Sequence, residues 1–184
     1  RAEEFHVEAA GPDVYRCFVL PTTFDRDMYV KAIEVQPGND RIVHHVIAFL
    51  DTSGRSAKLD QDAPGSGYST GAGYPGFLPA GGLGGWAPGN TVRRLPEGMA
   101  RPLPKGAAVV MQAHYHKTGK PETDRTRLGV YFAEEPVTRA VRSILVLPFG
   151  ARWSGMKIPA GADSHEVTAS LTLPRDVIAL VVTP

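Results

Sequence analysis

Four of the six histidines stand in two short groups, which makes them the first candidates for chemistry. His44 and His45 are adjacent within one apolar stretch, and His114 and His116 flank a tyrosine within another. An imidazole in an apolar strand carries a donor and an acceptor that both need partners, and a metal ion satisfies one ring nitrogen directly. A histidine-only site without clustered cysteines or carboxylates suits copper or zinc better than calcium or magnesium.

The spacing within each group predicts which side chains share a face. His44 and His45 point to opposite faces of a regular strand, so both reach one metal only where the strand twists, ends or bulges. His114 and His116 share a face, and from the residues alone they are the better pair. A buried, hydrogen-bonded structural role remains the alternative for each of these histidines. The other two histidines are expected at the surface: His6 and His165.

The remaining composition narrows the function. Lys and Arg total 20 against 19 Asp and Glu, a net charge of +1, so a nucleic-acid partner has little electrostatic support. The longest apolar run, residues 177–182, is too short to span a bilayer. Cys17 is the only cysteine, so no intrachain disulfide is expected, and its position between Arg16 and Phe18 in an apolar strand predicts a buried, unreactive thiol. The glycine-rich residues 81–89 lack the Lys-Ser or Lys-Thr of a phosphate-binding loop.

Alternating apolar residues and frequent turn residues predict the elements that must position these groups. The 20 glycines and 16 prolines leave little room for helices. Residues 51–106 are expected to form a long ordered loop, with Trp86 as an anchor either near the metal or at the far end of the fold. The pattern predicts an all-β fold, an antiparallel β-sandwich similar to a jelly roll. Strands are expected at residues 14–20, 28–36, 42–50, 107–116, 127–132, 139–147, 165–173 and 176–183.

Three longer motifs follow one another in a fixed order. They are Ile-Val-His-His-Val-Ile-Ala-Phe at residues 42–49, Gly-Trp-Ala-Pro-Gly at residues 85–89, and Leu-Pro-Lys-Gly-Ala-Ala-Val-Val-Met-Gln-Ala-His-Tyr-His at residues 103–116. This ordered set resembles the copper type II, ascorbate-dependent monooxygenases, the family of peptidylglycine α-hydroxylating monooxygenase and dopamine β-monooxygenase. Bacterial members are more similar still, through Tyr-Arg-Cys-Phe at 15–18, Gly-Lys-Pro-Glu-Thr-Asp at 119–124 and Ile-Pro-Ala-Gly at 158–161.

The resemblance implies two β-sandwich domains in series, each holding one copper. It places the first copper on His44, His45 and His114, and so implies a local distortion of the strand at the adjacent pair. His116 is then an extra histidine beside the ligands. The resemblance further implies that this copper cycles between Cu(I) and Cu(II) with ascorbate as reductant. Its electron would pass to the second copper, where O₂ hydroxylates a C–H bond of a small organic or peptide substrate.

The last part of the chain departs from the family pattern. Residues 1–136 correspond to the copper-binding first sandwich, and residues 137–184 to the opening strands of a second. The His-x-His and methionine ligands of the second copper have no counterpart, and Met156 is not in a matching position. We therefore expect the chain alone to be inactive, with residues 137–184 completed by a further carboxy-terminal part or a partner chain. Relatives also carry a partner for Cys17, and Ser69 and Thr70 stand near that place.

Two classes of function remain open from the sequence. The first is the electron-transfer half of a copper monooxygenase, exported to the periplasm or the cell exterior as the resemblance implies. The second is a non-catalytic β-sandwich that binds a metal or recognises a partner through its glycine-rich segment. The first interpretation predicts that a His-x-His motif follows residue 184 in the native protein.

Overall fold

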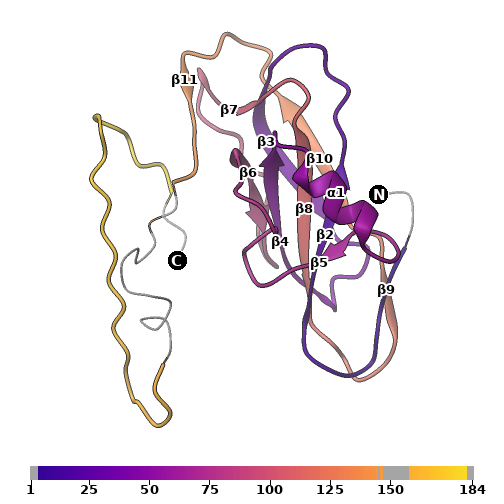
Figure 1. Ribbon diagram of the computed structural model, residues 1–184. Coiled ribbons are helices and arrows are strands. Elements are labelled where there is room, and N and C mark those ends of the chain that lie inside the picture. Colours follow the sequence, from indigo (N-terminus) through magenta and orange to yellow (C-terminus); the bar gives the residue numbers. More distant parts are fainter. Residues whose placement is uncertain (1–3, 145, 147–157, 182–184) are drawn as a thin grey trace. The chain divides into compact units, whose positions relative to one another are not determined.

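The computed structural model describes residues 4–144, 146 and 158–181 (Figure 1). By its internal contacts the chain divides into two units, Arg1–Ser143 and Ile144–Pro184. The boundary expected after residue 136 stays a prediction. No helix in the described parts of the chain has both the length and the apolar character needed to cross a membrane.

The first unit consists mainly of short strands. Its described residues form eleven strands and one helix: β1 (Phe5–Val7), β2 (Val14–Leu20), β3 (Met28–Gln36), β4 (Val43–Asp51), α1 (Arg55–Asp62), β5 (Tyr68–Ser69), β6 (Gly81–Trp86), β7 (Met99–Leu103), β8 (Ala108–Tyr115), β9 (Glu122–Asp124), β10 (Arg127–Phe132) and β11 (Arg139–Ala140).

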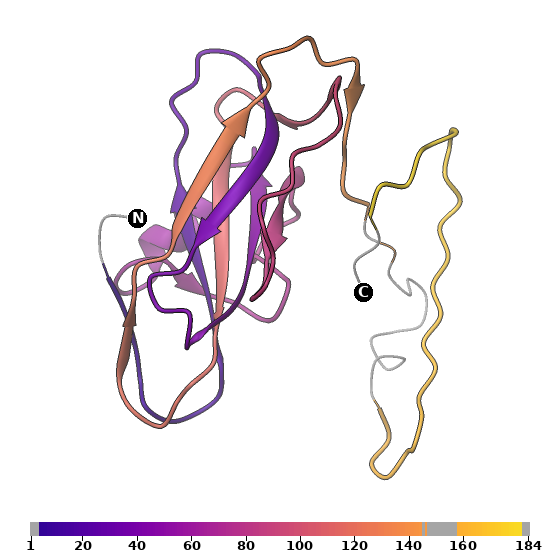
Figure 2. The same ribbon diagram turned by 180° about the vertical axis from the view of Figure 1, so that it is seen from behind.

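These strands form two packed sheets, which confirms the predicted all-β sandwich. The five-stranded sheet has the order β5-β2-β8-β4-β6, and the four-stranded sheet has the order β10-β3-β7-β11. Figure 2 shows β10 and β3 side by side in the second sheet, where they pair antiparallel. Phe18, Val46 and Met111 of the first sheet cluster with Val35 of the second, so the core lies between the two layers. β1 and β9 form a separate two-stranded sheet, in which they pair antiparallel with Phe5 opposite Asp124 and Val7 opposite Glu122.

The five-stranded sheet is also covered on part of its outer face. Along β8, Val109 and Met111 belong to the inner core, while Val110 belongs to a separate cluster on the opposite face. Leu59 of α1 packs against this outer cluster. Its buried members are Cys17, Tyr68, Phe77 and Val110. We call this the closed half of the outer face.

Most strands predicted from alternation are confirmed. β2 and β3 have the expected bounds, and β4, β8 and β10 agree with the expected ranges within one residue at each end. The prediction of a single long loop over residues 51–106 is wrong, because this stretch contains α1, β5, β6 and β7. β6 forms from glycines because it lies close against β4: a Cβ added at Gly85 would come within 2.8 Å of the carbonyl oxygen of Val46.

Local interactions explain why α1, the only helix of the described residues, forms although the many glycines and prolines predicted little helix. Gly54, with φ of 74°, directly precedes α1 in the left-handed region that glycine adopts without strain. Both carboxylate oxygens of Asp51 accept backbone hydrogen bonds in this turn, one from Ser53 and one from Ser56 in the first turn of the helix. Asp51 therefore ties the end of β4 to the start of α1.

The last predicted strands differ from the structure. Among the described residues of the range 139–147 only Arg139–Ala140 forms a strand, and the described residues 158–181 contain none. Apolar side chains expected inside a sheet are exposed there, among them Val167, Leu171 and Leu173. An alternating pattern becomes a strand only beside a hydrogen-bonding neighbour, and these described residues have no paired strand. Positions 145, 147, 182 and 183 of the predicted strands, and Met156, lie outside the described residues.

Candidate metal centre

A bulge in β4 brings the adjacent histidines to one side of the sheet. Val43 pairs with Tyr115 and His45 pairs with His114, so His44 is an extra residue between two paired positions. Such a bulge reorients the side chains that alternation would place on opposite faces. The strand therefore contains the local distortion that the adjacent pair requires.

The buried carboxylate of Asp124 ties together the chain segments on which this bulge depends. Its Oδ1 accepts a hydrogen bond from the backbone of Gly38 in the turn before β4, at 3.0 Å. Its Oδ2 accepts a hydrogen bond from the hydroxyl of Tyr115 at the end of β8, at 2.8 Å. The backbone N–H of His116 also donates to the carbonyl of Ile42 at 2.8 Å. These bonds hold the first residues of β4 against the last residues of β8, where the pairing shifts.

The side chains of His44, His45 and His114 form the one group of metal-binding type found among the described residues, and we call it the histidine trio. The Nδ1 atom of His45 lies 3.1 Å from Nδ1 of His44 and 3.4 Å from Nδ1 of His114. All three donor atoms lie within 4.8 Å of one another. Two nitrogens bound to one zinc at about 2.0 Å are at most about 4 Å apart, so small ring movements suffice to place the trio around one ion.

The three rings differ in how firmly the protein holds them. His44 is exposed, His45 is half-buried and His114 is only 7 % exposed. The ring of Tyr15 stacks on the ring of His114, with centroids 4.2 Å apart and planes 13° apart. Nε2 of His114 lies 2.8 Å from Oδ2 of Asp13, on the opposite side of the ring from the Nδ1 that faces His45. His114 is thus fixed by a stack and a hydrogen bond, while His44 stays accessible.

The surroundings of His45 favour its neutral, metal-binding form. Burial lowers the pKa of His45 below 6.5, and the neighbouring charges of His114 and His44 lower it further. His45 is therefore neutral at neutral pH, which is the form that binds a metal. The hydrogen bond from His114 lowers the pKa of Asp13 below 3.8, so this carboxylate is ionised.

The other histidines lie outside the trio. His116 is exposed and its Nδ1 lies 3.3 Å from Oδ1 of Asp13, so His114 and His116 each contact one oxygen of the same carboxylate. The same-face pair favoured by alternation therefore meets at the carboxylate of Asp13, and His116 is not a member of the trio. His6 and His165 are exposed, as expected from their neighbours.

Cys17 and Trp86, two other residues noted in the sequence, both pack in the interior of the fold. Cys17 is fully buried, burial raises the pKa of its thiol, and its Sγ lies 3.5 Å from Oγ1 of Thr70. Thr70 thus occupies the place opposite Cys17. Trp86 is the last residue of β6, pairs with Val46 next to His45, and packs against the inner core. It anchors a strand rather than a loop.

Two residues hold the ring of His114 and were not identified from the sequence: Tyr15 of β2 and Asp13, which immediately precedes β2. Tyr15 was part of a recognised motif, but its stacking on His114 depends on the pairing of β2 with β8. Nothing in the sequence indicated a role for Asp13, because a single aspartate before a strand is common. Its partners His114 and His116 are also about 100 positions away in sequence.

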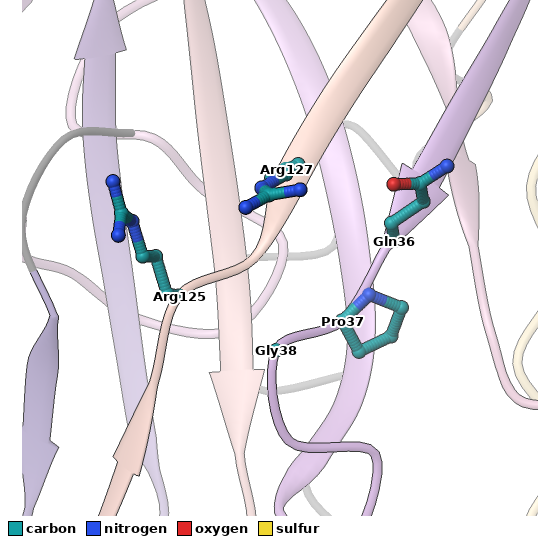
Figure 3. Close-up of a pocket in the computed structure, with 5 residues that line it drawn as sticks. All are labelled: Gln36, Pro37, Gly38, Arg125 and Arg127. Atoms are coloured by element: carbon teal, nitrogen blue, oxygen red, sulfur yellow. The ribbon is translucent and has the colours of Figure 1, made fainter.

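A shallow pocket of about 250 Å³ lies at the end of β3 and the start of β10. Figure 3 shows its lining residues, Gln36, Pro37, Gly38, Arg125 and Arg127. It contains no histidine and does not include the trio. This pocket therefore lies apart from the candidate metal centre.

Neither the known protein-family models nor the curated proteins gave a match to this chain when they were searched.

Proposed function

We propose that this chain is the copper-binding, electron-transferring part of a copper- and ascorbate-dependent monooxygenase. The observation that carries the proposal is the bulge at His44, which places three imidazole Nδ1 atoms from β4 and β8 close together. The residue motifs that resemble the copper type II monooxygenases contain these same three histidines.

The donor set supports copper because it is made only of imidazoles. Cu(I) and Cu(II) both accept imidazole nitrogen, and no thiolate or carboxylate belongs to the trio. A copper ion held there would supply one-electron chemistry with ascorbate as donor. His114 provides a ligand of fixed orientation, and the exposed ring of His44 leaves one side of the site open to a soluble reductant.

The remaining parts of the proposed reaction lie outside this site. C–H hydroxylation with O₂ would take place at a second copper held by a second domain, which also binds the small organic or peptide substrate. We place the protein in an oxidising, copper-accessible location, the periplasm or the cell exterior. No acid or base from the histidine trio is needed for electron transfer.

A non-catalytic metal-binding module is the second candidate, because the same three nitrogens suit zinc. The two functions differ in redox behaviour rather than in affinity, since most nitrogen sites bind Cu(II) more tightly than zinc.

The test is a copper titration followed by electron paramagnetic resonance, then addition of ascorbate without oxygen. We expect one bound Cu(II) per chain, loss of its signal with ascorbate, and return of the signal with a one-electron oxidant. His114→Ala serves as the matched control, because unbound copper is also reduced by ascorbate. Bound Cu(II) that stays oxidised in excess ascorbate would instead support the non-catalytic module, and unchanged binding in His114→Ala would refute the site.

A further inference from the structure

We propose that Asp13 is a positioning residue that selects which nitrogen of His114 faces the metal and strengthens that nitrogen as a donor. This inference rests on the proposed function, but its first consequence concerns the metal-free protein. Asp13 immediately precedes β2, and its carboxylate contacts one nitrogen of His114.

The selection follows from hydrogen-bond chemistry. An ionised carboxylate only accepts hydrogen bonds, so Nε2 of His114, 2.8 Å from Oδ2 of Asp13, must carry the proton. In a neutral imidazole the other nitrogen then has a free lone pair. That nitrogen is Nδ1, which lies 3.4 Å from Nδ1 of His45. Asp13 therefore holds His114 in the one neutral tautomer that can donate to a metal in the trio.

The packing around His114 restricts rotation of its imidazole ring, so Nε2 stays toward Asp13. Tyr15 stacks on this ring at a centroid distance of 4.2 Å, and His114 is 7 % exposed. Both constraints come from the same short segment, because Tyr15 pairs with His114 in the register of β2 with β8. Among the described residues neither His44 nor His45 has a carboxylate partner, so this control acts on one ligand only.

The other oxygen of Asp13 has its own partner. Nδ1 of His116 lies 3.3 Å from Oδ1, so the carboxylate is held between two rings although its side chain is 38 % exposed. His116 therefore orients the carboxylate and does not approach the trio. This gives a position in the site to the histidine that the family motif leaves without a role.

The hydrogen bond also has a redox consequence. A carboxylate on the distal N–H makes a ligating imidazole more basic, and removing such a partner typically weakens metal binding 10–100-fold. A more basic nitrogen favours Cu(II) over Cu(I). If Cu(II) affinity falls about 10-fold without Asp13 while Cu(I) affinity is unchanged, the one-electron reduction potential rises by about 59 mV.

The test compares Asp13→Ala and Asp13→Asn with the wild-type chain. Asp25→Asn is the matched control, since it removes a charge from an exposed aspartate that takes no part in the trio. Nitrogen-15 long-range correlation spectra of the metal-free proteins report the tautomer of His114. We expect Nε2–H in the wild type and the control, a mixture in Asp13→Ala, and a smaller change in Asp13→Asn, which keeps an acceptor oxygen.

Copper measurements complete the test. We expect Cu(II) affinity about 10-fold lower and a higher reduction potential in Asp13→Ala, with partial recovery in Asp13→Asn. A His114 that stays Nε2–H in Asp13→Ala, or an unchanged Cu(II) affinity and potential in that variant, would overturn the inference. Failure of the wild-type chain to bind copper would overturn the proposed function instead, and the tautomer spectra would still decide on Asp13.

Discussion

The outer face of the five-stranded sheet has two halves that are built from the same strands but differ in what covers them and in their side chains. In the closed half, Cys17 and Val110 lie under α1 and the segment that contains Phe77. In the open half, further along the same strands, the rings of His45 and His114 lie beside the ring of Tyr15. The side chains of β8 alternate in the same way from Val110 to His114, but β4 is bulged at His44 in the open half, and α1, the one helix among the described residues, packs against the closed half.

Gln112 marks the boundary between the two halves. It lies two residues from His114 on β8, and its buried amide binds the segment that follows β5. Its Nε2 donates to Oγ1 of Thr70 at 2.8 Å, and its Oε1 accepts from the backbone of Gly73 at 3.2 Å. Gln112 thereby fixes the segment after β5 next to the closed half, two residues along β8 from His114. One face of the sheet thus carries both a buried apolar cluster and three histidines that could hold a metal ion.

The largest expected effect is a loss of stability when the apolar cluster of the closed half is disrupted. Phe77→Ala removes a side chain that is 3 % exposed, and such a truncation lowers the free energy of unfolding by about 3–5 kcal/mol. The inner core and the trio do not include Phe77, so copper affinity of the folded variant should be unchanged. Urea unfolding and a copper titration below the unfolding range measure the two quantities. An equal loss of copper affinity would show that the halves are not independent.

The next largest expected effect is a loss of copper affinity when a histidine of the trio in the open half is replaced. Replacing His44, His45 or His114 by Ala should weaken copper binding by about 100-fold, about 2.7 kcal/mol, because a direct ligand matters at least as much as a supporting partner. The free energy of unfolding should change little for the exposed His44. His6→Ala is the control and should bind copper as the wild type does. Calorimetry against a competing chelator checks the affinity.

A smaller effect concerns the charge that anchors α1 over the closed half. Hydrogen bonds from Ser53 and Ser56 outweigh burial and lower the pKa of Asp51 from 3.8 to about 2. The stabilisation is therefore fully present above pH 3.8 and is lost as the pH falls through about 2. Asp51→Asn should lower the free energy of unfolding at pH 7 by about 2 kcal/mol, since one pKa unit corresponds to about 1.4 kcal/mol.

Unfolding curves of wild type and Asp51→Asn at several pH values measure this contribution. The two proteins should differ at pH 7 and approach one another toward pH 2. A constant difference over that range would mean that the shape of the side chain matters and its ionisation does not.

The smallest expected effect sharpens the definition of the open half. His116→Ala should change copper affinity by less than about 3-fold, because His116 contacts Asp13 rather than the trio. The measurement is the same chelator competition, with His44→Ala as the comparison. A larger loss in His116→Ala than in His44→Ala would identify the same-face pair as the ligands and reject the trio.

Local pattern alone predicted the strands whose neighbours are also strands of the first unit. β2, β3, β4, β8 and β10 carry alternating or continuous apolar side chains, and their bounds follow from that pattern. The glycine-rich β6 could not be recognised, because it forms by pairing with β4 and has little side-chain preference of its own. Residues 165–173 have the pattern of a strand but no neighbour among the described residues.

The candidate ligands show the same division between sequence and tertiary structure. Residue types indicated that histidines in apolar strands are the groups able to do chemistry here, and the resemblance selected His44, His45 and His114. Alternation by itself favoured His114 with His116, because a regular strand separates adjacent side chains. The bulge that brings the trio together depends on how β4 registers against β8. Asp13 reaches His114 across about 100 positions of sequence. Strand register and such long-range hydrogen bonds are set by the packing of the whole sandwich, so only the tertiary structure decided them.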